Sequence, residues 1–228
     1  MRTDTKRNFH LGVNFLLTPA VAVSTVQQLN FQQLLADPVK GVIFDTTQKQ
    51  GDAIVFSRQS PHLEVKIGPV GPQVSQLLIT APHPERLIED FEGECDFVVE
   101  AYREVWGVPA QILRRDCTIR HLYAVKEEHA FQFLWEKRLH QASDALGIFG
   151  RPIIGGGIRL VLQPDMVDQP LFEVKIESLL ADASQLFVET SAVWNKPVSG
   201  DQLAPRSLLE PAEKFMNNEV RNFIQADL

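Results

Sequence analysis

Pro61–Thr80 reads PHLEVKIGPVGPQVSQLLIT, and Pro170–Glu189, 109 residues further on, reads PLFEVKIESLLADASQLFVE. Aligned without a gap, the two stretches are identical at eight positions: Pro61, Glu64, Val65, Lys66, Ile67, Ser75, Gln76 and Leu77 of the first. Two unrelated segments of ordinary composition would share about one or two such positions. We therefore expect the chain to contain an internal repeat.

Both copies of this repeat carry the pattern of a β-hairpin. Leu63–Ile67 and Phe172–Ile176 alternate apolar and charged residues, which is typical of a strand that is buried on one face. The second run of each copy, Leu77–Ile79 and Leu186–Val188, is apolar throughout, as in a strand covered on both faces.

The regions around the two copies repeat the same order of elements. In the first half we predict a strand at 9–17, a helix at 24–37, strands near 41–47, 52–58, 62–68 and 75–80, and a helix at 84–106. In the second half we predict a strand at 112–125, a helix at 129–147, a strand at 157–163, the second hairpin and a helix at 207–225. The long helix 84–106 carries the clearest apolar stripe: Leu87, Phe91, Cys95, Val98, Tyr102 and Val105.

These elements predict an α+β fold of internally duplicated β-α-β(3-4)-α units. The units would form one antiparallel sheet, with the helices packed mainly on one face. We divide the chain into a disordered N-terminus at 1–8, a first repeat at 9–108 and a second repeat at 109–228, the two repeats forming one continuous domain. The inward side of helix 129–147 would be Phe131, Trp135, Leu139, Ala142 and Leu146, and that of the last helix Leu208, Ala212, Phe215, Val220 and Phe223.

Composition narrows the classes of function. With 228 residues and 44% hydrophobic content the chain can bury a sizeable core, and its net charge of −7 makes it an acidic protein. Because proteins that bind nucleic acid usually present a basic face, we expect no nucleic-acid partner. No apolar run of 18 residues occurs and no apolar segment follows the charged N-terminus, so we expect a soluble, cytoplasmic protein without a membrane partner. Cys95 and Cys117 have no metal-binding spacing; we expect free thiols, with a single disulfide as the alternative.

The most conspicuous short motif is the glycine run Gly155–Gly157. A phosphate-binding loop needs glycines between a strand and a helix N-terminus, whereas these follow a predicted helix and precede a strand. A tight turn or a bulge is the favoured interpretation, and Gly156 stays a candidate ligand contact.

Strand 112–125 supplies the other candidate site residues. Alternation places Cys117, His121 and Tyr123 on the apolar face and Arg120 on the opposite face. Cys117 and His121 would lie roughly 13 Å apart along a strand, too far for a Cys–His nucleophile pair. If the strand of Arg120 neighbours that of Arg159, the two guanidinium groups could flank an anionic ligand, or pair with Glu173 or Glu177. The candidate ligand-binding set is Arg120, His121, Tyr123, Gly156 and Arg159.

Arg115–Tyr123 also carries a resemblance to a known group. Its R-x-x-x-x-R-x-x-Y pattern precedes a helix, a Gly-x-x-Arg strand, a long strand and a final helix. Over residues 110–225 this arrangement resembles a sporadically distributed family of uncharacterised bacterial proteins of about this length, and departs from it at Asp116-Cys117, where a small apolar pair is expected. The resemblance implies a bacterial origin and no defined activity.

Two hypotheses of function follow. The sequence has no short catalytic, metal-binding or nucleotide-binding motif, so we expect neither a cofactor nor a metal, and a non-enzymatic role is favoured. The first hypothesis is a binding or scaffold module that uses a sheet face or edge to meet a protein partner or itself, as a homodimer. The alternative is a small-molecule-binding protein or enzyme with a pocket between sheet and helices.

Overall fold

The computed structural model describes residues 6–36, 41–84, 87–125 and 129–225. The strands are β1 (Arg7–Thr18), β2 (Thr46–Gln50), β3 (Ala53–Gln59), β4 (His62–Gly71), β5 (Val74–Pro82), β6 (Gln111–Ala124), β7 (Gly157–Leu162), β8 (Leu171–Ser178), β9 (Gln185–Trp194) and β10 (Val198–Ser199). The α-helices are α1 (Thr25–Leu35), α2 (Ile88–Trp106), α3 (Ala130–Gln132), α4 (Arg206–Phe215) and α5 (Arg221–Gln225). Two π-helical turns, η2 (Phe133–Arg138) and η5 (Met216–Val220), and two 3₁₀ turns, η3 (Ser143–Phe149) and η4 (Gly200–Gln202), complete the elements.

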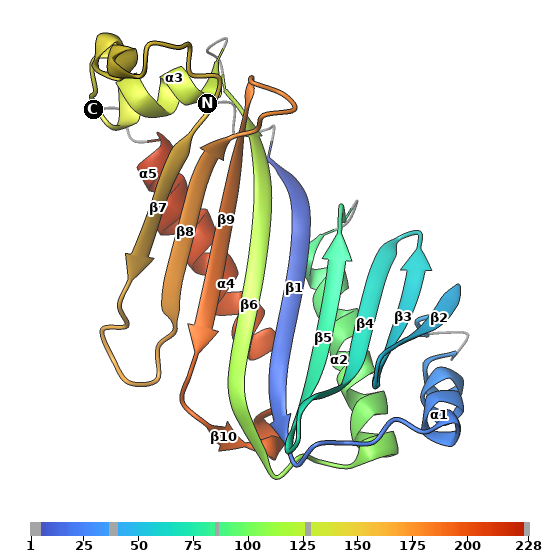
Figure 1. The fold of residues 1–228 in the computed structure, drawn as a ribbon. Coiled ribbons are helices and arrows are strands. Elements are labelled where there is room, and N and C mark those ends of the chain that lie inside the picture. The colour runs from blue at the N-terminus through green and yellow to red at the C-terminus, as the bar shows by residue number, and fades with distance from the viewer. Residues whose placement is uncertain (1–5, 37–40, 85–86, 126–128, 226–228) are drawn as a thin grey trace.

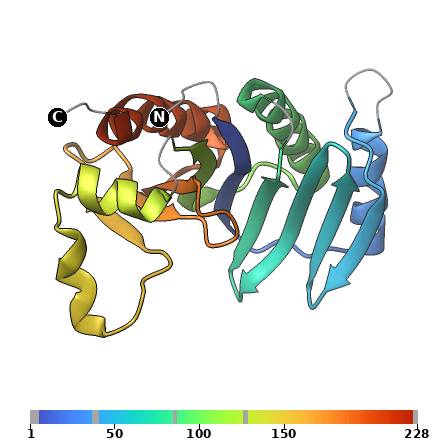
Figure 2. The ribbon, with the colours of Figure 1, turned by 90° about the horizontal axis from the view of Figure 1, so that it is seen from above.

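The strands form one antiparallel sheet, which confirms the predicted α+β class. Its order is β2-β3-β4-β5-β1-β6-β9-β8-β7, with the short β10 pairing with β6 (Figure 1). The helices α2, α4 and α5 lie on one face of this sheet, as the view from above shows (Figure 2). We call this the covered face, and the opposite side the open face. Among the described residues, no helix combines the length and apolarity needed to cross a membrane.

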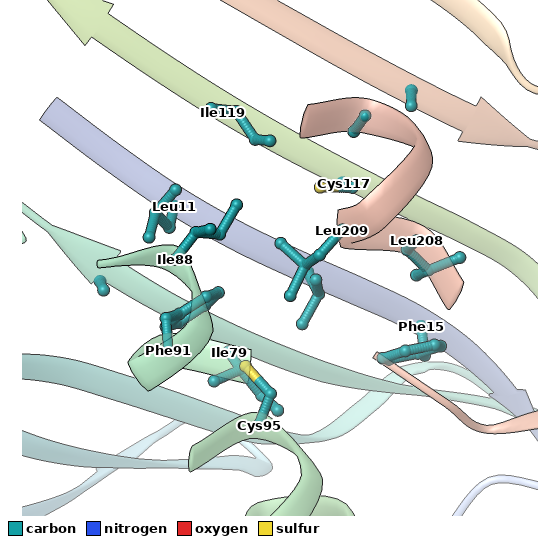
Figure 3. Close-up of a cluster of buried hydrophobic side chains, with 14 of the residues drawn as sticks. Leu11, Phe15, Ile79, Ile88, Phe91, Cys95, Cys117, Ile119, Leu208 and Leu209 are labelled. Carbon is teal, nitrogen blue, oxygen red and sulfur yellow. The ribbon is translucent and has the colours of Figure 1, made fainter. Parts of the chain in front are cut away.

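The core lies between the covered face and the helices. Leu11 and Phe15 of β1 point from the sheet centre toward Ile88 and Phe91 of α2 and toward Leu209 of α4 (Figure 3). All five side chains are buried, because the strand places alternate residues on this face and the helices turn their apolar sides toward it. The two cysteines lie in the same core as buried thiols that form no disulfide, so the prediction of two thiols rather than a disulfide is confirmed.

Each copy of the sequence repeat forms an antiparallel hairpin, β4–β5 and β8–β9. The hairpins differ in register, because Val65 pairs with Ile79 whereas its counterpart Val174 pairs with Thr190, two residues beyond the position that the ungapped alignment would give. A shift of two residues keeps every side chain on its face. Val65 and Val174 are therefore both buried on the covered face.

The two halves also agree in the order of their strands. β1 is followed outward by β5, β4 and β3, and β6 is followed by β9, β8 and β7. Strand β2 extends the first half by one more strand, whereas β7 is the last strand of the second half. The sheet therefore has one edge at β2 and the other at β7.

Two predictions near the N-terminal half were wrong. The strand expected at 41–47 is a loop as far as Asp45, and the strand begins at Thr46. The apolar residue Phe44 led to the strand prediction, but it packs on the core from a loop, with its ring centroid 5.6 Å from that of Phe56. At the chain start, Arg7 and Asn8 belong to β1 rather than to a disordered segment, and residues 1–5 lie outside the described residues.

The continuous helix predicted at 129–147 is also wrong. The structure has a single turn, α3, then the π-helical η2, which ends at Arg138, and a separate 3₁₀ turn, η3. His140 has a φ of 50°, a left-handed conformation that ends a helix. Consequently Ala142 is exposed, and the buried side chains are Ala130, Phe133 and Leu134 instead of the predicted stripe.

The last helix occupies the predicted range but changes phase along its length. The π-helical η5 separates α4 from α5, and such a turn inserts a residue into the helical repeat. Leu208, Ala212 and Val220 are buried as predicted. Phe223, predicted to point inward, is 38% exposed, and Ile224 takes the buried position.

Candidate functional site

The predicted site residues do not gather in one place. Arg120 on β6 and Arg159 on β7 lie on the open face, whereas His121 and Tyr123 of β6 are buried on the covered face. Gly156 immediately precedes β7. The strands of the two arginines are not neighbours, although the sequence allowed that arrangement, because β9 and β8 lie between them. Three strand spacings separate the arginines by roughly 14 Å.

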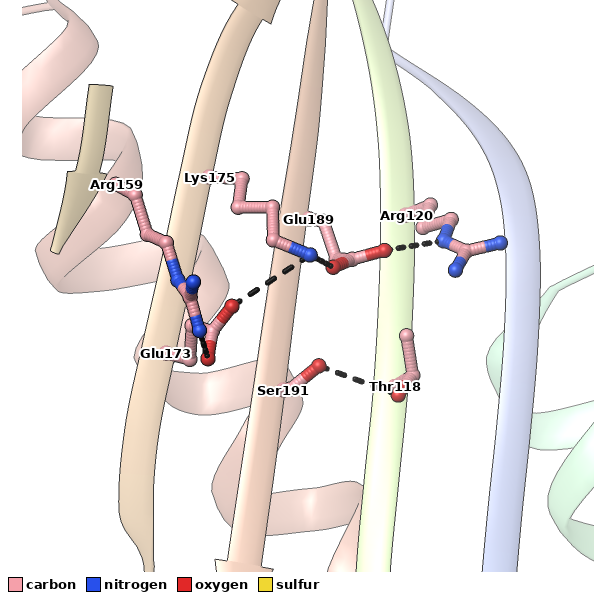
Figure 4. Close-up of polar contacts among 7 residues, drawn as sticks. All are labelled: Thr118, Arg120, Arg159, Glu173, Lys175, Glu189 and Ser191. Carbon is pink, nitrogen blue, oxygen red and sulfur yellow. Dashed lines mark hydrogen bonds and ion pairs between the residues drawn. The ribbon is translucent and has the colours of Figure 1, made fainter. Parts of the chain in front are cut away.

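A line of alternating charges connects the two arginines across the open face (Figure 4). Arg120 donates from Nε to Glu189 Oε2 at 2.6 Å, and Lys175 Nζ donates to the other oxygen of Glu189, also at 2.6 Å. Lys175 lies 3.5 Å from Glu173, which accepts a hydrogen bond from Arg159 Nη2 at 2.6 Å. We call these five residues the charge ladder. Arg159 thus pairs with Glu173, as the second alternative had it, whereas Arg120 pairs with Glu189, a partner that the sequence analysis did not name.

Glu189 is the centre of the charge ladder and its most buried member, at 6% exposure. Burial by itself would raise the pKa of its carboxyl, but the hydrogen bonds from Lys175 and Arg120 outweigh burial and hold that pKa below its ordinary value. The carboxylate therefore stays charged at neutral pH. Both oxygens of Glu189 have a cationic partner, and each cation of the charge ladder is paired with a carboxylate. The charge ladder therefore joins neighbouring strands, and its cations are not available as a site for an external anion.

His121 and Tyr123 form a separate buried pair. His121 Nδ1 lies 3.2 Å from the Tyr123 hydroxyl, and one hydrogen bond joins them. Burial, together with the nearby charge of Lys6, lowers the pKa of His121 to about 3, and burial raises the pKa of Tyr123 to about 12. At neutral pH the imidazole is neutral and the phenol is protonated. Neither group has the pKa near 7 that suits a general acid or base.

His121 also borders a cavity of about 630 Å³ at the N-terminal end of α2. Charged side chains line it together with His121: Lys6, Arg7, Glu89, Asp90 and Glu213. Lys6 Nζ donates to Asn217 at 2.8 Å, which ties the start of β1 to the C-terminal helix. Within the described residues, no group of three or more His, Cys, Asp or Glu side chains is arranged to hold a metal ion.

At the glycine run Gly155–Gly157 the backbone passes close to neighbouring segments of the chain. The Gly156 N–H donates to Ser178 Oγ at 3.1 Å, and the Ser178 N–H donates to the Gly156 carbonyl at 3.0 Å. A Cβ on Gly156 would press on Phe131, and one on Gly157 would collide with the Ile176 carbonyl. Since the Gly156 amide is already bonded to protein, it does not form a phosphate cradle.

The apolar residues of β7 are the feature of the second half that the sequence analysis did not single out as a site, although it named Arg159 on the same strand. Leu160, Val161 and Leu162 are 42%, 56% and 38% exposed, on a strand that has a neighbour on one side only among the described residues. Leu160 and Leu162 lie on the covered face, opposite Val174 and Phe172, whereas Val161 lies on the open face. An apolar edge strand is a surface on which another chain can pair.

An apolar groove of about 180 Å³ continues from β7 onto the C-terminal helices. Apart from Glu219 it is lined by apolar side chains: Leu160, Leu162, Val174, Ile176, Phe215, Val220 and Phe223. The groove exists because the π-helical η5 turns Phe223 outward, toward the edge. The apolar residues of β7 (GIRLVL) can be recognised in the sequence, but their exposure follows from the position of β7 at the end of the sheet.

Comparisons with known proteins add little to this geometry. No model of a protein family matches the chain, and no curated protein matches its sequence. Among solved structures, the Trypanosoma brucei AdoMetDC-delta26 monomer is similar over 85% of this chain and 66% of its own length, with 7% sequence identity and a TM-score of 0.27. A likeness at that TM-score carries no argument about fold or activity.

Proposed function

We propose that this protein is a non-enzymatic association module that pairs with a second copy of itself through the β7 edge. The observation that carries the proposal is the run Leu160–Leu162, exposed on an edge strand and continuous with the apolar groove. Large exposed apolar surfaces on a folded protein mark interaction sites. Of the described residues, nine large exposed apolar side chains fall between 148 and 180, around β7: Ile148, Phe149, Ile154, Leu160, Val161, Leu162, Met166, Val167 and Leu180.

The contrast with the other edge supports the proposal. Strand β2 reads TTQKQ, is exposed at four of its five residues and carries Lys49. Polar residues and lysine are the usual means by which an edge strand avoids pairing with other chains. The β7 edge has Arg159, which is paired with Glu173, and is otherwise apolar from Ile158 to Leu162.

The similarity of the two halves indicates what would pair with the free side of β7. We propose that the halves arose by internal duplication; the matching hairpins and the matching order of strands support this. Under that equivalence β7 corresponds to β3, which is covered by β2 and whose Phe56 packs on Phe31 of α1. In the described part of the second half, no strand stands at the place of β2. A strand from another copy would take that place.

The sequence of β7 is compatible with pairing to itself. An antiparallel pair centred on Leu160 would place Leu160 opposite its own copy and Ile158 opposite Leu162, all on the covered face. Arg159 would then lie opposite Val161, so that the two arginines are not directly opposed. Such a pair is isologous and closes into a dimer without leaving an apolar edge.

The oligomeric state of the purified protein tests this proposal. We expect native mass spectrometry and light scattering to give a dimer at micromolar concentration. Leu160→Lys should shift the protein to a monomer, because it places a charge in the centre of the apolar pair. Leu160→Cys should crosslink to its own copy across the two-fold axis; the buried Cys95 and Cys117 should not compete.

Gln48→Lys on the β2 edge is the matched control, since it adds the same charge to the opposite edge strand and should leave the dimer intact. A monomeric wild-type protein would overturn the proposal. So would a dimer that survives Leu160→Lys unchanged, because another surface would then hold the copies together.

A further inference from the structure

A further cleft, separate from the groove beside β7, lies on the covered face next to the N-terminal end of α4. It has a volume of about 690 Å³, within the range of small-molecule sites. Three segments enclose it: the β7–β8 loop near Asp168, the β9–β10 connection around Lys196 and Pro197, and the first turns of α4 at Ser207 and Pro211. Arg115 of β6 and Trp194 of β9, paired across neighbouring strands, line it from the sheet.

Arg115 is an unusual cation for this position. It lies on the covered face, in register with the buried Phe15, and its guanidinium carbon is 5.9 Å from the ring centroid of Trp194. Its Nε is buried without a hydrogen-bond partner, and no ion pair joins Arg115 to another residue of the described chain. The other cation of the cleft, Lys196, is already paired with Asp168 at 2.6 Å.

Leaving a buried donor without an acceptor costs free energy, and the cost is larger for a charged group than for a neutral one. Burial accordingly lowers the pKa of Arg115, with the charge of Asp168 opposing this. Arg115 lines the cleft, and an oxyanion there would bring a negative charge beside this guanidinium. A guanidinium binds carboxylate or phosphate through two parallel hydrogen bonds.

We propose that this cleft binds a small organic oxyanion, a phosphate or carboxylate, through Arg115. The rest of the wall indicates the other part of such a ligand, because Pro170, Pro197, Val198 and Pro211 are apolar. An apolar body would lie against these residues while the anionic group meets the guanidinium. Lys196, at the rim, neutralises Asp168, so that this carboxylate does not repel the bound anion. This inference is independent of the proposed pairing through β7.

Phenyl phosphate, which combines the two features, is the probe for calorimetric titration of the full chain. We expect saturable binding to the wild-type protein. Arg115→Gln should weaken it by about tenfold or more, since a bidentate charged contact is lost. Lys196→Gln, an exposed substitution that does not endanger folding, should weaken it by a smaller factor.

Arg114→Gln is the matched control, because the neighbouring arginine is exposed, pairs with Asp116 at 3.3 Å and does not line the cleft. It should leave binding within about twofold. The proposal is overturned if millimolar phenyl phosphate shows no saturable binding to the wild type, or if Arg115→Gln and Lys196→Gln bind it as the wild type does. Phenol and inorganic phosphate, titrated separately, should each bind more weakly than the combined probe.

Discussion

The two outer ends of the sheet are built from corresponding strands but finish differently. At the first end β3 is covered by β2 and by the side chains of α1, so that Phe56 is fully buried. At the second end the corresponding β7 has no further strand among the described residues, and Leu160 remains 42% exposed. The difference teaches that similar strand patterns do not imply similar surroundings. Without a further strand and a covering helix, the position that is core in the first half is partly exposed in the second.

The interiors of the halves differ in a second way. Both carry Glu-Val-Lys-Ile, but Lys66 lies opposite Leu78, whereas the shifted register places Lys175 opposite Glu189. The second half therefore has the charge ladder. In the described part of the first half, no ion pair joins Glu64 or Lys66 to another residue. A shift that leaves every face unchanged has decided which residues are electrostatic partners.

The strongest test of the correspondence is to charge both cores. Val65→Asp and Val174→Asp each bury an unpaired carboxylate at positions that are 0% and 1% exposed. Each should lower the free energy of unfolding by a similar amount, about 3 kcal/mol or more, measured by urea denaturation. Gln48→Asp on the exposed β2 should change it by less than about 0.5 kcal/mol. A strong effect in one half alone would mean that the hairpins are not equivalent.

A somewhat smaller effect is expected where each outer strand crosses its hairpin closely. Beside the Ile54–Ile67 pair, Gly68 approaches Ala53, and beside the Ile158–Ile176 pair, Gly157 faces Glu177. A Cβ on either glycine would collide with backbone, so Gly68→Ala and Gly157→Ala should each cost about 2 kcal/mol in thermal unfolding.

Gly93→Ala provides the contrast for this pair. Gly93 lies inside α2 with open space around its Cα, so alanine there should stabilise by about 0.5–1 kcal/mol through helix propensity. If Gly68→Ala and Gly157→Ala were both neutral, the close approach of the outer strand to its hairpin would not be a feature that the two halves share.

Removing the centre of the charge ladder should have a smaller effect, confined to the second half. Glu189→Gln leaves Lys175 and Arg120 beside each other without their shared carboxylate and should cost about 1.5 kcal/mol at pH 7. Because the folded-state pKa of Glu189 is lowered, this contribution is present above its unfolded pKa and lost as the pH falls through the folded one. The difference between wild type and variant should thus shrink at low pH.

Thr80→Val, at the corresponding position of the first hairpin, is the matched comparison for Glu189→Gln. It touches no ion pair of the described residues, so its effect on unfolding should be independent of pH. An equal dependence on pH in the two variants would show that the ladder is not what distinguishes the second half.

The last prediction concerns one histidine on each central strand. Burial lowers the pKa of His10 on β1 to about 4, with Arg120 contributing, and the pKa of His121 on β6 to about 3. Between about pH 4 and 6.5 the unfolded chain binds more protons than the folded one, so stability rises with pH by up to about 1.4 kcal/mol per unit for each histidine.

His10→Gln and His121→Gln should each flatten that slope, followed by urea denaturation at several pH values. His140→Gln, which removes an exposed imidazole, is the control and should leave the slope as it is. An unchanged slope in both variants would show that neither histidine is held neutral by burial.

The sequence by itself determined much of the architecture. Alternation in the repeated hairpins and a regular apolar stripe are local signals, so the two hairpins, the helix α2 with its buried residues from Phe91 to Tyr102, and the faces of β6 could be predicted. The same alternation was enough to predict that Arg120 and His121 lie on opposite faces of β6.

What surrounds each element was decided only in the tertiary structure. The spacing of apolar residues along the chain does not reveal the order of strands in the sheet. For this reason the sequence could not show that β7 is an edge strand, or that two strands lie between those of Arg120 and Arg159. A π-helical turn changes the phase of a helix without a clear sequence signal, and so Phe223 points outward. Register and strand order depend on contacts far apart in the chain, which a reading of neighbouring residues does not contain.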